Sequence, residues 1–215
     1  MNSEHREIIT FIGRTYQKDL NAYSERFITD CVRNRMAHAG LGTPSQYLSR
    51  LKDDQAEASA LIKSLNITYS EFFRDPLAFA NLEQFVLPRL IHGRLNRNEI
   101  RVWSAGCAAG QEAFSIAMAL DEALRAEASG PDFRIFATDL CDEALASAQA
   151  GVYRPDRLGN LKVWQLQTYF DKIGEAYRIR QDIRNRVCFS LYDLLDRASA
   201  TPPESIFGDF DIVFC

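Results

Sequence analysis

The sequence has 215 residues, of which 47% are hydrophobic and 25% are charged, enough apolar material for one large domain or two small ones. Its formal net charge of −4 at pH 7 provides no overall attraction for a polyanion, which argues against nucleic acid as the partner. Residues 1–9 lack a signal pattern, and no apolar run approaches the roughly 18 residues of a membrane span, so we expect a cytoplasmic protein without membrane insertion.

The first part of the chain predicts a succession of amphipathic helices, because apolar residues recur there at helical spacing. Helices are expected around residues 8–12, 27–32 and 47–51, and at about 54–65 and 76–91.

Local signals indicate where two of these helices begin. Either Thr43 or Ser45 can cap the third helix, after a glycine- and proline-containing turn. Asp75 before Pro76 predicts a helix start, because a carboxylate there accepts from the free amides of the first turn. We assign residues 1–75 to a helical N-terminal domain and residues 76–98 to a linker helix.

After about residue 98, short apolar strands alternate with helices. Strands are expected at 100–104, 133–138, 187–191 and 210–215, and helices at about 111–128 and 143–149. This alternation is typical of a parallel sheet with crossover helices, which predicts an α/β domain over residues 99–215. Tyr177–Arg180 followed by Arg186–Phe189 predicts a small β excursion near residues 171–189.

A turn of small residues follows the first expected strand, at residues 105–110. Gly106 and Gly110 have no Cβ, which permits a ligand to approach the backbone before the next helix begins. Two glycines in such a turn also occur where elements simply pack tightly, so this turn alone indicates binding only weakly.

Carboxylates follow two further strands, at the edge where open α/β sheets bind ligands. Asp139 can accept from two ribose hydroxyls, although it can equally cap the helix that follows. Asp193 can accept from an adenine amino group, and Leu194 can cover the ring face. A glycine turn with two such carboxylates suits a nucleoside without a phosphate chain, and no Gly-Lys-Ser/Thr phrase indicates a nucleoside triphosphate.

The five cysteines are widely spaced, without a Cys-x-x-Cys pair, and only three histidines accompany them. This pattern supports neither a disulfide framework nor a zinc site, so no metal is expected. We interpret Cys107, in the glycine turn, as a small buried residue rather than a reactive thiol.

Three phrases together resemble the CheR family of chemotaxis receptor glutamate methyltransferases. They are Thr68-Tyr-Ser-Glu-Phe-Phe-Arg-Asp75, the run Trp-Ser-Ala-Gly-Cys-Ala-Ala-Gly-Gln-Glu-Ala-Phe-Ser from Trp103 to Ser115, and Ala137-Thr-Asp139 with Gly151-Val-Tyr153. The resemblance extends into the helical part through Arg33-Asn-Arg-Met36 and Tyr47-Leu-x-x-Leu51. It implies an all-helical N-terminal domain followed by a Rossmann-like class I methyltransferase domain that binds S-adenosylmethionine.

The resemblance also implies particular cofactor contacts. They fall on Thr68, Ser70, Arg74, Gly106, Glu112, Asp139, Asp193 and Leu194. Three of these positions depart from the family pattern. Thr68 stands where the family usually has asparagine, Ser70 replaces threonine, and Asp193 replaces asparagine but keeps an acceptor. Glu112 can bind the amino group of the methionyl moiety, and an ordinary first-turn glutamate is its alternative interpretation.

Arg74 is the predicted catalytic residue. Methyl transfer to a carboxylate needs no general base, because glutamate is ionised at neutral pH, but it needs the carboxylate to be desolvated and oriented. A guanidinium is always charged and offers two parallel donors for that task. A surface pair with Glu71 or Asp75 is the alternative for Arg74, and we interpret Phe72 and Phe73 as packing residues.

Arg26, Arg33 and Arg35 are candidates for docking the glutamate-rich cytoplasmic helices of chemoreceptors, because Arg26 and Arg33 share a helix face. Arginines on a helix face that is simply exposed to solvent would show the same spacing. The short segment Asp171–Tyr177 argues against a second, tethering contact to a receptor tail. The oligomeric state stays open.

Residues 210–215 read as a buried strand, and the family continues beyond this point, so we expect a fold truncated after its fourth core strand. The competing function is a non-catalytic module that binds the cofactor or a receptor. A nucleic-acid methyltransferase is disfavoured, since neither a basic groove nor an Asp/Asn-Pro-Pro-aromatic phrase is present.

Overall fold

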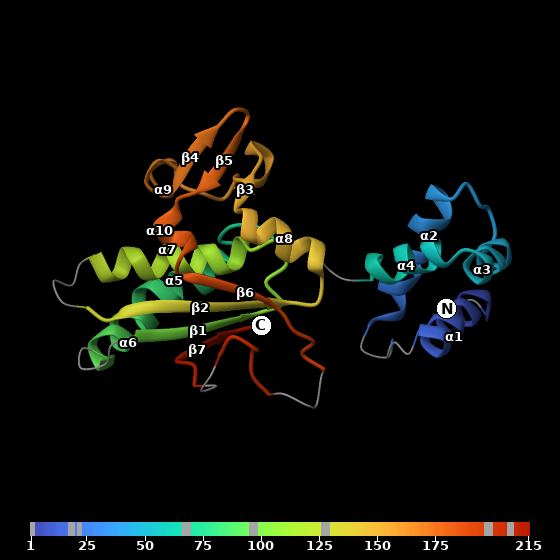
Figure 1. Ribbon diagram of the computed structural model, residues 1–215, viewed down its shortest axis with the longest axis horizontal. Helices are drawn as coiled ribbons and strands as arrows, with labels where there is room; N and C mark the ends of the chain where they lie inside the picture. The colour runs from blue at the N-terminus through green and yellow to red at the C-terminus, as the bar shows by residue number, and fades with distance from the viewer. Residues whose placement is uncertain are drawn as a thin grey trace. The chain divides into compact units, whose positions relative to one another are not determined.

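The computed structural model describes residues 3–16, 20, 23–65, 70–94, 99–125, 130–195, 200–205 and 209–215 (Figure 1). The chain divides into two compact units, Met1–Ile67 and Thr68–Cys215. The division comes earlier than the boundary expected at residue 75, because Phe72 and Phe73 are buried in the core of the second unit.

The first unit is helical in its described residues, as the sequence predicts. Its helices are α1 (Ser3–Tyr16), α2 (Glu25–His38), α3 (Pro44–Asp53) and α4 (Gln55–Ser64). Their buried apolar faces form one core, which includes Ile8, Ile12, Ile28, Val32, Tyr47, Leu51 and Leu61. Thr43 caps α3, and its hydroxyl accepts a hydrogen bond from the amide of Gln46. Of the two caps that the sequence allowed, the structure uses Thr43.

A polar cluster connects three helices of this unit. Arg35 donates from Nε and Nη2 to the two carboxylate oxygens of Glu57, at 3.0 and 2.5 Å, and the Tyr47 hydroxyl donates to Oε1 at 2.8 Å. Burial raises the pKa of Glu57, but the bonds from Arg35 and Tyr47 outweigh it and hold that pKa below its ordinary value. Burial, followed by the bond to Glu57, raises the pKa of Tyr47, which therefore stays a donor.

A parallel sheet forms the centre of the second unit. Its strands are β1 (Glu99–Ala105), β2 (Asp132–Asp139), β6 (Val187–Leu191) and β7 (Ile212–Phe214), in the order β6-β2-β1-β7. The register places Ala105 beside Thr138, Asp139 beside Leu191, and Ser104 beside Phe214. The carboxyl ends of the strands therefore meet at one edge, as expected for an α/β domain.

Crossover helices cover this sheet. They are α7 (Gln111–Arg125), which follows β1, and α8 (Asp142–Ala150), which follows β2. Figure 1 shows α7 along one side of the sheet. Residues 113–120 of α7 are fully buried or nearly so, because this helix packs between the sheet and the elements outside it.

The expected linker helix belongs to the core of the second unit. It consists of α5 (Pro76–Asn81), a π-helical turn η1 (Leu82–Val86) and α6 (Leu87–Arg94), and it buries Leu82, Leu87 and Ile91. The Leu87 amide donates to the carbonyl of Leu82, one residue further back than in an α-helix. Pro88 has no amide to donate, so the wider turn falls where a regular helix would lose a hydrogen bond.

A small antiparallel sheet interrupts the alternation. Its strands are β3 (Val152–Tyr153), β4 (Phe170–Ile173) and β5 (Ala176–Ile179), in the order β3-β5-β4. The short helices η2 (Pro155–Arg157), α9 (Val163–Tyr169) and α10 (Gln181–Arg184) accompany it. Of the two segments from which the β excursion was predicted, residues 176–179 form β5, which pairs with β3 and β4. Residues 187–191 form β6 and pair with β2 in the main sheet.

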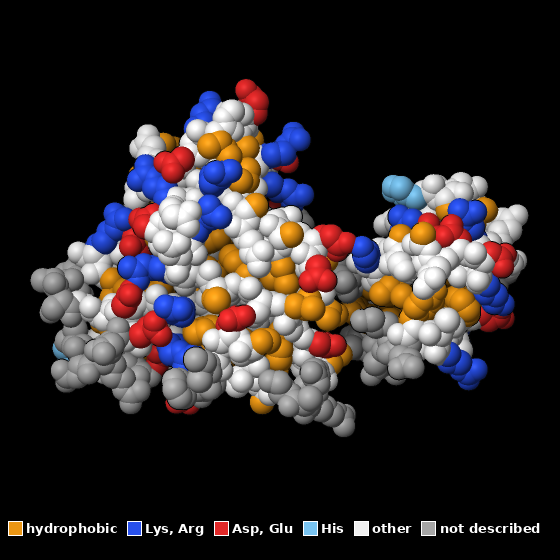
Figure 2. Space-filling model, viewed as in Figure 1, with side chains coloured by type: hydrophobic (Ala, Val, Ile, Leu, Met, Phe, Trp, Pro, Cys, Tyr) orange, Lys and Arg blue, Asp and Glu red, His pale blue; other side chains and the backbone are white. Residues whose placement is uncertain are grey.

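The surface of the second unit has charges of both signs. Figure 2 shows Lys, Arg, Asp and Glu side chains interspersed over the small sheet and its surroundings, without a broad area of one sign on the face in view. Within the described residues, no helix is both long and apolar enough to cross a membrane.

Candidate functional site

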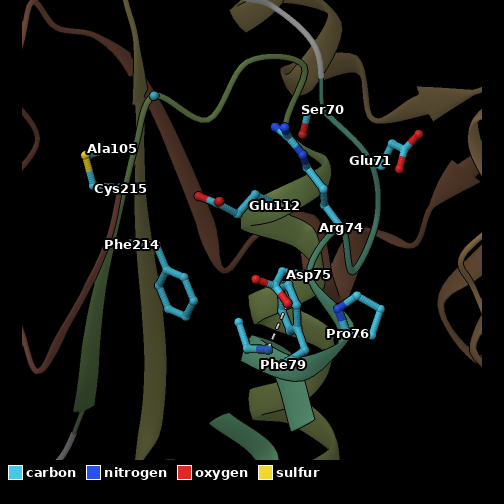
Figure 3. A pocket seen from close by; sticks show the side chains of 12 residues that line it. Ser70, Glu71, Arg74, Asp75, Pro76, Phe79, Ala105, Glu112, Phe214 and Cys215 are labelled. Carbon is cyan, nitrogen blue, oxygen red and sulfur yellow. Dashed lines mark hydrogen bonds between the residues drawn. The ribbon is translucent and has the colours of Figure 1, made fainter. Parts of the chain in front are cut away.

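A cavity of about 630 Å³ opens at the carboxyl edge of the main sheet (Figure 3). One wall comes from the segment that leads into α5, with Ser70 and Arg74, and from α5 itself, with Phe79. The facing wall comes from the end of β1, the start of α7 and the end of β7. Gly106 and Glu112 belong to this second wall, so the cavity brings together four of the predicted site residues.

The glycine turn is fixed to the neighbouring strand. The amides of Gly106 and Cys107 both donate to the carbonyl of Thr138 at the end of β2, at 2.8 and 2.9 Å. Gly106 has a φ of +82°, and a Cβ built there would meet no atom within 4 Å. The backbone at Gly106 is thus exposed to the cavity and open to a ligand, as the turn of small residues predicts.

Gly110 is needed for packing rather than for access. Its φ is +87°, and an added Cβ would lie 2.8 Å from the Cβ of Ala148 in α8. The two glycines of the turn therefore do different things, one exposing the backbone and the other permitting close approach of a helix.

Glu112 presents a carboxylate to the cavity from the first turn of α7. The hydroxyl of Ser104 on β1 donates to Oε1 of Glu112 at 2.7 Å, and Figure 3 shows the carboxylate directed into the open space. The second carboxylate oxygen can accept from a ligand ammonium. Ser104 is fully buried, so it orients Glu112 from within the sheet.

Asp139 supports the glycine turn from β2. Its Oδ2 accepts from the amide of Ala108 at 2.7 Å, and its Oδ1 accepts from the amide of Cys141 at 2.9 Å. Ala108 has a φ of +48°, unusual for a residue with a side chain, and the bond to Asp139 holds it there. The N-cap position of α8 is Cys141, so the alternative of Asp139 as the cap is wrong. A carboxylate oxygen can accept two hydrogen bonds, so each oxygen of Asp139 has acceptor capacity for a ribose hydroxyl beyond the one bond described here.

Asp193 and Leu194 follow β6, one strand away from Asp139. The amide of Tyr192 donates to the carbonyl of Asp139, which ties the two strand ends together. Oδ1 of Asp193 accepts from the amide of Leu195, and 47% of Leu194 is exposed. Asp139, Asp193 and Leu194 lie at the same edge of the sheet as the cavity but do not line it.

Arg74 lines the cavity from the segment before α5. Figure 3 shows its side chain extending along that segment toward Ser70. Phe72 and Phe73 are 0% and 8% exposed, which confirms them as packing residues. Asp75 caps α5 by accepting from the amides of Leu77 and Ala78, as predicted. Thr68 lies outside the described residues.

The three arginines proposed for docking differ in their surroundings. Arg26 and Arg33 are exposed on α2, and Arg33 pairs with Asp30 at 3.2 Å. Arg35 is occupied by its two hydrogen bonds to Glu57, which gives it a role inside the first unit.

Cys107 is buried beside the cavity. Burial, followed by the negative charges of Asp139 and Glu112, raises the pKa of its thiol well above the ordinary value. A thiol in these surroundings is a poor nucleophile, which agrees with its interpretation as a packing residue.

Sequence reasoning missed three supporting side chains. Ser104 and Ser115 belong to the phrase from Trp103 to Ser115, but their contacts to Glu112 and Phe73 depend on the fold. The hydroxyl of Tyr153 donates to the carbonyl of Ala109 in the glycine turn, at 2.8 Å. In the sequence, these three residues were indicated by their positions inside the phrases that resemble the CheR family.

Comparisons with known proteins identify the family of both units. Residues 68–215 match the model of the CheR methyltransferase SAM-binding domain, and residues 3–65 match that of the CheR methyltransferase all-alpha domain. The chain is 36% and 35% identical, over 196 residues each and 86% of its length, to proteins named chemotaxis protein methyltransferase from Salmonella typhimurium and Escherichia coli. It is also 32% identical, over 209 residues and 97% of its length, to an uncharacterized 104.1 kDa protein of Rhodobacter capsulatus.

An open parallel sheet with a glycine turn and acidic side chains at its carboxyl edge defines a nucleoside-binding α/β domain. The chain belongs to the CheR methyltransferase family, with the all-alpha domain first and the SAM-binding domain after it. It spans 63% and 64% of the Salmonella and Escherichia coli relatives and 21% of the Rhodobacter protein.

The residues present fit S-adenosylmethionine, the cofactor that the matched domain binds. Gly106 leaves its backbone open, Glu112 offers an acceptor for the ammonium group, and Asp139 offers acceptors for ribose hydroxyls. Ser70 is 9% exposed and lines the same cavity.

Proposed function

We propose that the protein transfers a methyl group from S-adenosylmethionine to glutamate side chains of chemoreceptors, forming glutamate methyl esters in chemotaxis adaptation. The observation that carries this proposal is the cavity that holds Arg74 and Glu112 together beside the exposed backbone of Gly106. One cavity therefore contains a cation for an acceptor carboxylate, an anion for the cofactor ammonium and room for the cofactor itself.

The bound cofactor supplies an electrophilic methyl group on a sulfonium. No residue of the chain needs to remove a proton, since a glutamate with an ordinary pKa of about 4.3 is already ionised at neutral pH. Removal of water would raise that pKa, and the guanidinium of Arg74 opposes this rise while two parallel N–H groups orient the carboxylate. Arg74 is thus the proposed catalytic residue, through binding and orientation.

The acceptor helix requires a docking surface of opposite charge. Arg26 and Arg33 on α2 are exposed and are proposed for this contact, since a glutamate-rich helix offers carboxylates at helical spacing. Arg35 is a weaker candidate because Glu57 already accepts its hydrogen bonds. Reversal of charge at Arg33 should raise the apparent KM for the receptor and leave binding of S-adenosylhomocysteine unchanged.

Calorimetric titration with S-adenosylhomocysteine tests the cofactor half of the proposal. The wild-type protein is expected to bind and Asp139→Ala is expected not to, because this variant removes the ribose acceptor and the support of Ala108. Unaltered binding by Asp139→Ala would contradict the assigned site.

Transfer of a labelled methyl group to receptor cytoplasmic fragments tests the chemical half. Arg74→Lys keeps the positive charge but loses the bidentate geometry, so we expect it to lower kcat at least tenfold, a larger factor than its effect on the Kd for S-adenosylhomocysteine. Cofactor binding without transfer in the wild-type protein would favour a non-catalytic binding module instead.

A further inference from the structure

The segment that carries Arg74 has an unusual backbone. Phe73 has a φ of +47°, although it is a bulky aromatic residue with only 8% of its surface exposed. Such a conformation costs roughly 1–3 kcal/mol and persists only where the surrounding structure imposes it. The turn at Phe73 directs both phenylalanines into the core and leaves Arg74 on the cavity side.

Ser115 of α7 holds this turn. Its hydroxyl accepts a hydrogen bond from the Phe73 amide at 3.0 Å and donates one to the carbonyl of Gln111 at 2.7 Å. The Ser115 side chain is fully buried, so its hydrogen bond with the Phe73 amide is shielded from solvent. Ser115 lies three residues after Glu112 on the same helix, and residues at this spacing share a helix face.

A second connection runs from the same segment to the glycine turn. The ring of Phe72 packs edge-on against Tyr153, with the ring centres 4.9 Å apart. The Tyr153 hydroxyl donates to the carbonyl of Ala109 within the turn. The segment is therefore attached at Phe73 to the helix that presents Glu112, and at Phe72 to the turn that exposes Gly106.

We propose that Ser115 is a positioning residue that sets Arg74 at a fixed place relative to the cofactor turn, and so couples acceptor binding to cofactor binding. The inference rests on the proposed function, because Arg74 is there the group that orients the acceptor carboxylate. A misplacement of about 1 Å in such a group can cost on the order of 100-fold in rate.

The alternative is that Ser115 contributes only one buried hydrogen bond to stability. Tyr169→Phe provides a matched control, because the Tyr169 hydroxyl donates to Asp121, also on α7, at 2.9 Å. Tyr169 is 1% exposed and does not line the cavity, so its loss tests stability without touching the Arg74 segment.

The experiment compares wild type, Ser115→Ala, Ser115→Thr and Tyr169→Phe. Ser115→Ala is expected to lower kcat at least tenfold and to change the Kd for S-adenosylhomocysteine less than threefold, and Ser115→Thr, which keeps the hydroxyl, should recover most of the rate. Tyr169→Phe should lower the Tm while kcat stays unchanged. Equal rates in Ser115→Ala and Tyr169→Phe at matched stability would overturn the inference.

Hydrogen exchange provides a readout that does not depend on methyl transfer. S-adenosylhomocysteine is expected to slow amide exchange in residues 70–75 of the wild-type protein, and this effect should disappear in Ser115→Ala. If the wild type shows the effect but transfers no methyl group, the proposed function fails while the coupling through Ser115 stands. If the ligand slows exchange equally in both proteins, or in neither, the coupling is refuted.

Discussion

Replacement of Gly110 by alanine tests whether this glycine is required for close packing against α8 rather than for access of a ligand to the backbone. An alanine at φ +87° costs roughly 1–2 kcal/mol in backbone strain. Its Cβ would also lie 2.8 Å from Ala148 Cβ and 3.2 Å from the Phe189 ring, and such overpacking costs about 1–3 kcal/mol. The expected total loss is about 2–5 kcal/mol, a large part of the roughly 5–15 kcal/mol that stabilises a typical domain.

Gly106→Ala is the matched control in the same turn. Its φ is +82°, but the added Cβ meets nothing within 4 Å, so only the strain of roughly 1–2 kcal/mol is expected. Because that Cβ would enter the cavity, Gly106→Ala should weaken S-adenosylhomocysteine binding more strongly than its small loss of stability suggests.

Urea unfolding followed by tryptophan fluorescence measures both variants. The two tryptophans, Trp103 and Trp164, lie in the second unit, so the signal reports on the unit that contains the turn. A Gly106→Ala variant that is destabilised as much as Gly110→Ala would refute the assignment of packing to one glycine and access to the other.

Three further outcomes are expected. Glu57→Gln should destabilise the first unit by about 2–3 kcal/mol, seen as faster hydrogen exchange in α2 and α4, because it breaks a partly buried pair with Arg35. The pKa of Glu57 is lower in the folded protein than in the unfolded chain, where it is about 4.3. The stability that this carboxylate contributes is therefore present above the unfolded pKa and is lost as the pH falls through the folded pKa. In Glu57→Gln, this part of the loss of stability in acid should be missing. Asp75→Ala removes the acceptor for two amides and should cost about 1 kcal/mol in urea unfolding, with an unaltered midpoint contradicting the cap. A thiol reagent should modify exposed Cys215 rapidly and Cys107 only on unfolding, so Cys107→Ser should leave the fast phase unchanged.

Much of the fold could be predicted because its signals are local. The strands near residues 100, 133 and 187, the helix cap at Asp75 and the glycine turn each depend on residues within a few positions of one another. The pairing of the small sheet could not be predicted in this way. Its strand β5 pairs with β3 and β4, whereas residues 187–191 pair with β2 in the main sheet.

The sequence by itself determined the α/β class, the helical first part, and the placement of Gly106 and Asp139 at one edge of the sheet, because periodicity and strand ends specify these features. Glu112 was indicated by the family resemblance of its phrase. Only the tertiary structure decided that the second unit begins before residue 70, that Arg35 is occupied by Glu57, and that Ser115 holds Phe73. The physical reason is that these contacts join residues 22 to 42 positions apart, and hydrogen-bond distances of about 3 Å between them depend on how the elements pack.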